Sequence, residues 1–366
     1  MDINYQTTEE QPIDQKRIIG LDLIKAICMI MVILCHTMMK FIKDFDSNYL
    51  FNFIWLIQMP TFFFVSGFLH KKSFKCFADF AKWAFKNVFS YLIPYFSFAV
   101  LLLLVKENFD FSNTINDPTQ ILWFLFVLFW ITLFFGLGVF LAGLSKAKIL
   151  KFILPVLCVA FLDGIMAIVY FKVGHMFFAS KYIIYYSFYY LFGFLFELLF
   201  SKFIRCNKRI VLIKTIGIFA SLLCLSLVVF LVPSVYGLSD ESIKDLFIRV
   251  GGSISGSIFM FFVFFDLKNT KFNNTISKAG RFSLEFYYLH LLALAFIPTT
   301  IGDTPLSQWG YAFLFLLILI LVCSFSILIL YAIPFGHFIL FGKSFSFYKF
   351  ERKLFLKNDW SSALLF

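Results

Sequence analysis

The feature that most constrains this chain is a series of long apolar segments that recurs along the whole sequence. Each segment approaches the roughly 20 residues that an α-helix needs to cross the hydrocarbon core of a bilayer. We expect about ten such helices, at residues 18–41, 50–69, 87–105, 120–142, 152–171, 182–200, 211–232, 247–266, 282–300 and 310–333. The sequence therefore predicts an all-α, polytopic membrane bundle.

Composition excludes the water-soluble classes of protein. Of the 366 residues, 61% are apolar and 14% are charged, whereas a soluble domain is nearer half apolar and a quarter charged. The apolar segments leave no room for a separate globular domain. We expect a disordered polar tail at 1–15, one membrane domain at 16–340 and a basic, aromatic tail at 341–366 on the cytoplasmic surface.

The basic residues predict the orientation of the bundle. With a cytoplasmic N-terminus, 24 Lys and Arg residues lie on the cytoplasmic side and seven lie outside, while Lys25 lies within the first helix. Cytoplasmic loops carry an excess of Lys and Arg, so we predict that both termini are cytoplasmic. This placement accounts for the net charge of +11 without a nucleic-acid partner.

Titratable residues inside the predicted helices are the first candidates for chemistry, because a charge in the hydrocarbon core is costly. They are Asp22, Lys25, His36, Asp163, Glu197, Glu285 and His290. Lys25 and His36 are eleven residues apart, which places them on one face of the first helix at an axial separation of about 16 Å. In the alternative reading, Lys25 pairs with Asp22 at the inner interface and His36 makes an ordinary hydrogen bond within the bundle.

The ninth helix carries a second polar face. Ser283, Tyr287 and His290 follow each other at helical spacing, and Glu285 is placed to pair with Arg281. Asp163, near the middle of the fifth helix, must face water or find a partner.

The remaining histidines and the cysteines are not expected to carry chemistry. His70, His175 and His337 are predicted to be surface residues, and the seven cysteines lack paired metal-ligand spacing. We expect no metal site.

Five motifs in order resemble the bacterial integral-membrane acyltransferase 3 family. They are LDLIKAICMIMVILCH at Leu21–His36, QMPTFFFVSGFL at Gln58–Leu69, YLIPY at Tyr91–Tyr95, LWFL at Leu122–Leu125 and SLEFYYLH at Ser283–His290. In this family the first helix carries an Arg, ten residues and then a His. His36 matches the histidine, whereas the arginine is here Lys25. The family's arginines before the proline of the third motif are here Lys82 and Lys86.

The resemblance implies a bundle that takes an acyl group, usually acetyl, from cytoplasmic acyl-coenzyme A and delivers it to a carbohydrate acceptor at the outer side of a bacterial inner membrane. His36 is the expected general base, since an imidazole has a suitable unperturbed pKa. Lys25 is the second residue expected to take part in catalysis. The residues expected to bind acceptor or line the lumen are Ser66, Trp123, Asp163, Ser283, Glu285, Tyr287 and His290. The basic residues expected to bind the donor phosphates are Lys25, Lys71, Lys72, Lys82 and Lys86.

A second function class is a transporter or flippase of a lipid-linked saccharide. Transporters often carry paired repeats or interrupted helices in corresponding halves, and the sequence has neither pattern. The Lys25–His36 face and the motif in the second helix favour the enzyme.

Overall fold

A computed structural model describes residues 19–70, 73–105, 109–147, 149–174, 176–201, 210–232, 234–236, 242–267, 270–297 and 304–342. Nearly all of this part of the chain is helical, and it contains no strand. The predicted tail at 1–15 and residues 343–366 of the second tail lie outside the described residues. The all-α, polytopic architecture predicted from the hydropathy is therefore confirmed.

Nine helical segments in the described part of the chain are long and apolar enough to cross a membrane. They are α1 (Ile19–Phe41), α2 (Tyr49–Phe68), the continuous segment Phe77–Val105, α6 (Trp123–Gly143), α7 (Leu150–Lys172), α8 (Ser180–Leu199), α9 (Ile210–Leu231), α10 (Ile243–Phe264) and α13 (Pro305–Ala332). The short elements are η1 (Phe45–Ser47), α5 (Asn113–Asn116), η3 (Pro118–Gln120), η4 (Phe177–Ala179), α11 (Lys271–Arg281), α12 (Ser283–Phe296) and α14 (Pro334–Phe341). Most boundaries lie within a few residues of those predicted.

The third predicted helix begins ten residues earlier than expected. It consists of α3 (Phe77–Asn87), a π-helical turn η2 (Val88–Leu92) and α4 (Ile93–Val105). Pro94 has no backbone N–H to donate to the preceding helical turn. The widened π turn Val88–Leu92 lies directly before this proline. Hydropathy located only the apolar second half, because α3 is amphipathic.

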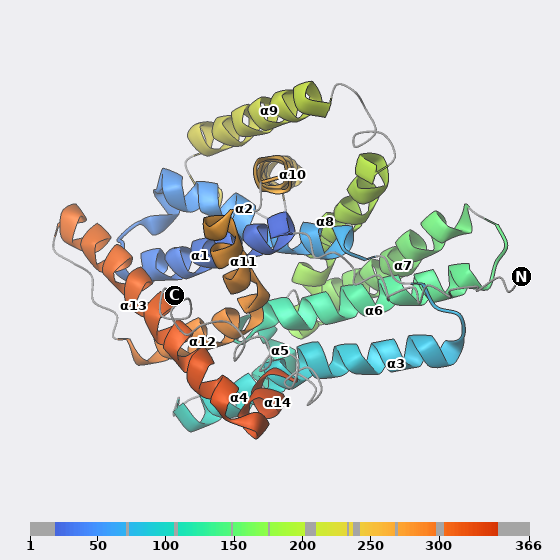
Figure 1. Cartoon of the computed structure of the whole chain (residues 1–366), viewed down its shortest axis with the longest axis horizontal. Coiled ribbons are helices and arrows are strands. Elements are labelled where there is room, and N and C mark those ends of the chain that lie inside the picture. The colour runs from blue at the N-terminus through green and yellow to red at the C-terminus, as the bar shows by residue number, and fades with distance from the viewer. Residues whose placement is uncertain are drawn as a thin grey trace, which may run out of the picture.

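The ninth predicted helix, 282–300, is shorter than expected. Its helical part, α12, has 14 residues and spans about 21 Å at 1.5 Å per residue, less than the hydrocarbon core. The amphipathic helix α11 precedes it, with a break at Phe282. Figure 1 shows α11 and α12 near the middle of the bundle beside α1, with α9 and α3 towards opposite edges.

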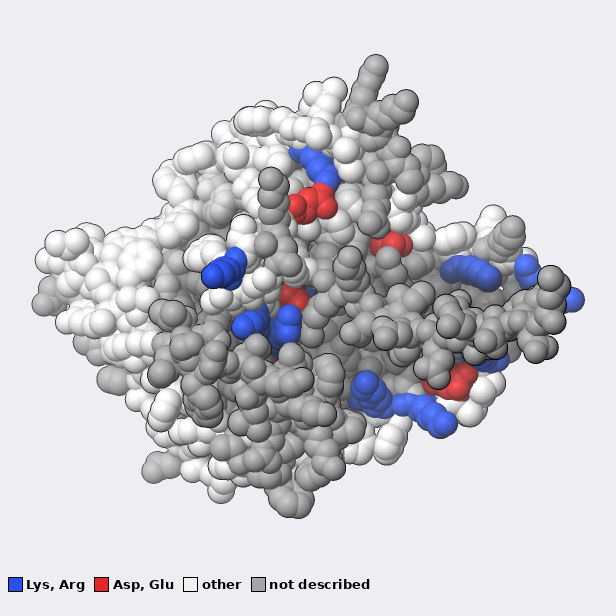
Figure 2. Space-filling model, viewed as in Figure 1, with Lys and Arg blue, Asp and Glu red and all other residues white. Residues whose placement is uncertain are grey.

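Contacts at the helix ends join segments that the hydropathy assigns to the same side. On the predicted outer side, the Lys43 N–H donates to Gln308 at 3.2 Å. On the predicted cytoplasmic side, Lys214 pairs with Asp266. Figure 2 shows the described Lys and Arg side chains of the viewed face in several separate groups.

Two glycines allow α2 and α8 to pack with their backbones in close approach. A Cβ on Gly67 would collide with the Tyr190 carbonyl oxygen, and a Cβ on Gly193 would collide with the carbonyl oxygen of Phe64. Small residues at a helix crossing are a common device in membrane bundles. This contact fixes the tyrosine-rich helix α8 against α2.

Candidate active site

Two histidines from distant parts of the chain meet inside the bundle. His36 lies in the C-terminal half of α1, and His290 lies on α12. Nε2 of His290 is 3.4 Å from Nδ1 of His36, and the ring centroids are 5.2 Å apart. His290 is fully buried, whereas His36 is half-buried. The pair therefore has one histidine accessible from a cavity and one behind it.

Backbone carbonyls assign the tautomers of both rings. His36 Nδ1 lies 2.9 Å from the carbonyl oxygen of Val32, and His290 Nδ1 lies 2.8 Å from that of Phe286. A carbonyl only accepts hydrogen bonds, so each Nδ1 carries the hydrogen and each Nε2 carries a lone pair. The His290 Nε2 lone pair consequently faces the Nδ1–H of His36, and the lone pair of His36 Nε2 is the basic site.

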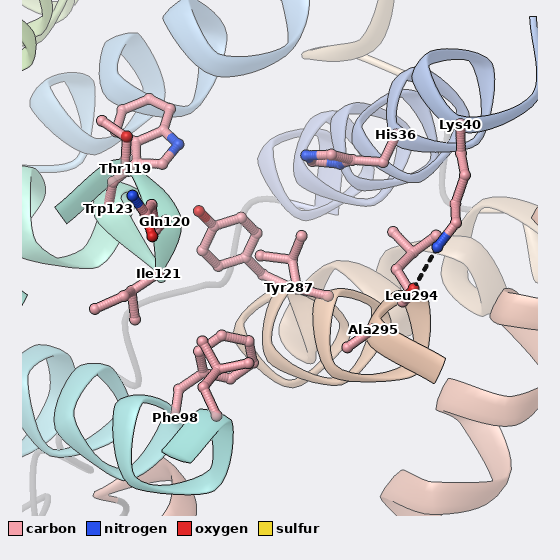
Figure 3. Close-up of a pocket in the computed structure, with 12 residues that line it drawn as sticks. His36, Lys40, Phe98, Thr119, Gln120, Ile121, Trp123, Tyr287, Leu294 and Ala295 are labelled. Atoms are coloured by element: carbon pink, nitrogen blue, oxygen red, sulfur yellow. Dashed lines mark hydrogen bonds between the residues drawn. The ribbon is translucent and has the colours of Figure 1, made fainter. Parts of the chain in front are cut away.

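His36 lines a cavity of about 280 Å³ that is open to the surface. Its polar lining residues are His36, Lys40, Thr119, Gln120, Trp123 and Tyr287, and the rest of the wall is apolar. Figure 3 shows the His36 imidazole and the Tyr287 hydroxyl directed into the same space, with Trp123 and Gln120 on the opposite wall. Because η3 and the end of α1 border it, the mouth lies on the predicted outer side.

An aromatic wall forms one side of the cavity. The Trp123 ring lies 4.8 Å from the Tyr182 ring and 5.1 Å from the Tyr186 ring, centroid to centroid. Tyr186 in turn stacks on Phe63 of α2 at 4.5 Å. Packed aromatic rings hold the Trp123 indole in a defined orientation at the cavity surface.

Of the lumen residues predicted from sequence, the structure brings three to one place. Trp123 and Tyr287 line the cavity with His36, and His290 contacts both His36 and Tyr287. The other predicted lumen residues, Ser66, Asp163, Ser283 and Glu285, are not among the described residues that line it.

The polar residues away from the cavity have local contacts. The Ser66 hydroxyl donates to the Phe62 carbonyl oxygen at 2.8 Å, one turn earlier in α2. The Ser187 hydroxyl on α8 donates to Oδ2 of Asp163 on α7 at 2.7 Å. Glu285 is fully buried in the first turn of α12. Asp163 thus has a hydrogen-bond partner, which is one of the two alternatives expected for a carboxylate within a helix.

The basic residues predicted to bind the donor fall into two groups. Lys25 Nζ lies 3.8 Å from Asp22, which is the pairing of the alternative reading of the sequence, and Asp22 also lies 4.0 Å from Nε of Arg281. Lys82 and Lys86 are exposed on α3, which packs against α6. Lys71 and Lys72 lie outside the described residues.

Sequence reasoning missed several residues at the site. Lys40 is one of the seven basic residues predicted to lie outside and has no part in the predicted site, although it follows His36 by one helical turn and so shares its face of α1. Tyr182 and Tyr186 also share one face of α8 by the same spacing.

The prediction that His70 is a surface residue was wrong. His70 is half-buried at the end of α2, with Nδ1 2.6 Å from the Tyr190 hydroxyl and its ring 4.6 Å from Phe135. It packs between α2, α6 and α8. The prediction rested on the two lysines that follow His70 in the sequence, which are typical of an exposed segment. His175 and the side chain of His337 lie outside the described residues.

In the described part of the chain, no group of three or more His, Cys, Asp and Glu residues is arranged to hold a metal ion.

The model of the acyltransferase 3 family, described as an acyltransferase domain, matches residues 18–331. Comparisons with curated proteins and with solved structures found no significant match.

Proposed function

Since the chain belongs to the acyltransferase 3 family of membrane acyltransferases, we propose that it moves an acetyl group from cytoplasmic acyl-coenzyme A to a hydroxyl of a carbohydrate at the outer side of a bacterial inner membrane. The observation that carries the proposal is the His36–His290 pair at a cavity that is open to the surface, and the mouth of this cavity lies on the predicted outer side. Transfer to a hydroxyl needs a base within hydrogen-bond reach, and His36 is the histidine among the residues that line this cavity.

The tautomers support a direct role for His36. As the acceptor oxygen forms its bond to the acyl carbon, His36 Nε2 takes the hydroxyl proton. The C–S bond of the thioester then breaks, and the proton passes to the sulfur to release the free thiol of coenzyme A. During the step, His36 is an imidazolium whose Nδ1–H faces the Val32 carbonyl oxygen and the Nε2 lone pair of His290. Both acceptors stabilise the positive charge.

The shape and lining of the cavity support a sugar acceptor. Trp123 presents a large flat surface, and Gln120, Thr119 and Tyr287 supply hydroxyl and amide groups around it. A pyranose has an apolar face of C–H groups and an edge of hydroxyls, which matches an aromatic wall with polar groups at its border. The cavity volume suits a single sugar unit.

The basic residues of the cytoplasmic side support an anionic donor. Lys82 and Lys86 project from exposed positions of α3, and Lys25 lies half-buried near the inner end of α1. Coenzyme A carries several phosphates, and a cationic surface on the cytoplasmic side attracts it. The acyl group must then travel along the bundle to reach His36.

The test is acyl transfer by purified protein in lipid vesicles, with labelled acetyl-coenzyme A and a panel of glycans. His36→Ala should lower turnover by about a hundredfold or more because it removes the base. His175→Ala, which changes a histidine predicted to lie in an outer loop, is the matched control and should retain activity. Near-normal transfer by His36→Ala at normal abundance would exclude His36 from the mechanism.

A further inference from the structure

The Tyr287 hydroxyl lies at the wall of the cavity that contains the candidate base. Tyr287 is on α12, its side chain is buried, and it lines the cavity together with His36. Figure 3 shows its hydroxyl group directed into the same space as the His36 imidazole. A reactant that occupies this space therefore meets both groups.

The start of α6 determines how this hydroxyl is used. The backbone N–H of Phe124, in the first turn of α6, donates a hydrogen bond to the Tyr287 hydroxyl oxygen. The N–H groups of a first helical turn have no acceptor within their own helix, and they lie at the positive end of its dipole. Because the hydroxyl oxygen accepts in this bond, its own hydrogen stays available to donate into the cavity.

Ring contacts hold the Tyr287 side chain in this position. Its ring lies 5.8 Å from the His290 ring and 5.7 Å from the Phe124 ring, centroid to centroid. The His290 ring lies in turn 5.2 Å from the His36 ring. Tyr287 and His36 therefore both contact His290, one with a hydrogen to donate and the other with a basic lone pair.

Attack on a thioester places a negative charge on the acyl oxygen. When the acceptor oxygen bonds to the acyl carbon, an electron pair of the C=O bond moves to the carbonyl oxygen, and His36 Nε2 takes the hydroxyl proton. The C=O bond then reforms as the C–S bond breaks, and the proton passes from His36 to the departing sulfur. A hydrogen-bond donor already in place at the carbonyl oxygen stabilises the transition state.

We propose that the Tyr287 hydroxyl is this donor, which makes Tyr287 a catalytic residue that stabilises the acyl oxyanion and stays protonated throughout. The inference rests on the proposed function, because it assigns a role in that same reaction. Apolar lining residues, among them Phe98 and Leu102, lower the local dielectric constant and so strengthen a hydrogen bond to a developing charge. The competing role is that Tyr287 only binds a hydroxyl of the acceptor sugar.

Tyr287→Phe tests the role, because it removes the hydroxyl and keeps the ring contacts. The reactions are hydrolysis of labelled acetyl-coenzyme A without acceptor, and transfer of the label to methyl β-D-glucoside and to methyl β-D-galactoside, by the full-length protein in lipid vesicles. An oxyanion donor acts on the acyl group whatever attacks it. We therefore expect kcat to fall about a hundredfold, by the same factor for water and for both sugars, with the acceptor KM unchanged.

Tyr288→Phe is the matched control and should retain all three rates. It removes the hydroxyl of the next tyrosine of α12, which contacts Ser97 and is not among the described residues that line the cavity. Thermal unfolding of both variants shows whether a lost rate reflects a lost fold. A raised acceptor KM with an unchanged kcat in Tyr287→Phe would overturn the inference and assign Tyr287 to acceptor binding, as would a loss confined to the sugar reactions.

The same measurements separate this inference from the proposed function. Hydrolysis that depends on Tyr287, without transfer to either sugar, would support the oxyanion role and contradict the proposed transfer to sugar. Transfer to sugar at the wild-type rate in Tyr287→Phe would support the proposed function and overturn the inference. The absence of every reaction in the wild-type protein would contradict both.

Discussion

Replacing His290 should slow acyl transfer without abolishing it. His290 is fully buried behind His36, and its Nε2 lone pair faces the Nδ1–H of His36 at 3.4 Å. When His36 takes up the proton, this contact becomes a hydrogen bond to a charged group. The partner thus stabilises the transition state more than the ground state, which is the condition for an effect on kcat.

The magnitude follows from the contact geometry. A hydrogen bond to a charged group contributes about 1.5–3 kcal/mol, and a separation of 3.4 Å lies at the long end of the range. The lower figure, about 1.5 kcal/mol, corresponds to a roughly tenfold fall in kcat for His290→Ala. His290→Gln retains a carbonyl oxygen that is able to accept the same hydrogen bond and should lose less.

The assay is steady-state acetyl transfer by the purified variants, with kcat and KM determined for donor and acceptor. Tyr288→Phe is the matched control, since it removes a hydroxyl of the same helix that contacts Ser97 rather than the histidine pair. The double variant of His36 and His290 should be no slower than His36→Ala alone, because His290 acts through His36.

Two results would refute this reasoning. A loss in His290→Ala as large as that in His36→Ala, with intact folding, would make His290 the base rather than its partner. An unchanged kcat would show that the contact between the rings does not matter for the chemistry.

Three further predictions concern the donor side, the packing and the orientation. Lys25→Met should raise the KM for acyl-coenzyme A about tenfold, while Lys25→Arg should stay active, because both Lys and Arg carry a positive charge that can bind phosphate. An unchanged KM for the donor in Lys25→Met would restrict this lysine to its pairing with Asp22. Gly67→Ala should lower the free energy of unfolding, measured by thermal unfolding, by about 1–3 kcal/mol, because the added Cβ collides with α8. Gly164→Ala should not, because no atom lies within 4 Å of its added Cβ. Equal stability of the two variants would contradict the close packing of α2 and α8. Reporter fusions after α4 and α7 should read outside and those after α6 and α8 inside, and a reversed pattern would refute the orientation.

Local composition determined the class of this protein and most of its helices. An apolar run of spanning length has few alternatives to a membrane helix, because every backbone polar group in lipid must be bonded within the segment. Because hydropathy is averaged over a short stretch of sequence, it also explains why the third and ninth predicted helices have the wrong bounds. Helix α3 is amphipathic and α12 is shorter than a membrane span, so neither matches an apolar segment of spanning length. The break between α11 and α12 at Phe282 is not marked by any change in hydropathy.

Spacing along single helices also identified contacts that stay within one element. The Asp22–Lys25 pair was the alternative reading of a three-residue spacing, and the structure contains this pair. His36 was singled out as a deep histidine in a motif typical of acyltransferases. These conclusions needed no knowledge of which helices are neighbours.

Only the tertiary structure decided what faces His36. His290 follows it by 254 positions in the sequence, and the Trp123 indole reaches the same cavity from a third element, α6. Lys40 shares the helix of His36, yet its ammonium group donates a hydrogen bond to the Leu294 carbonyl oxygen at the end of α12. Periodicity specifies which residues share a face of one helix. Which other helix contacts that face depends on how helices of unequal length and tilt pack together, and this packing is a property of the whole bundle.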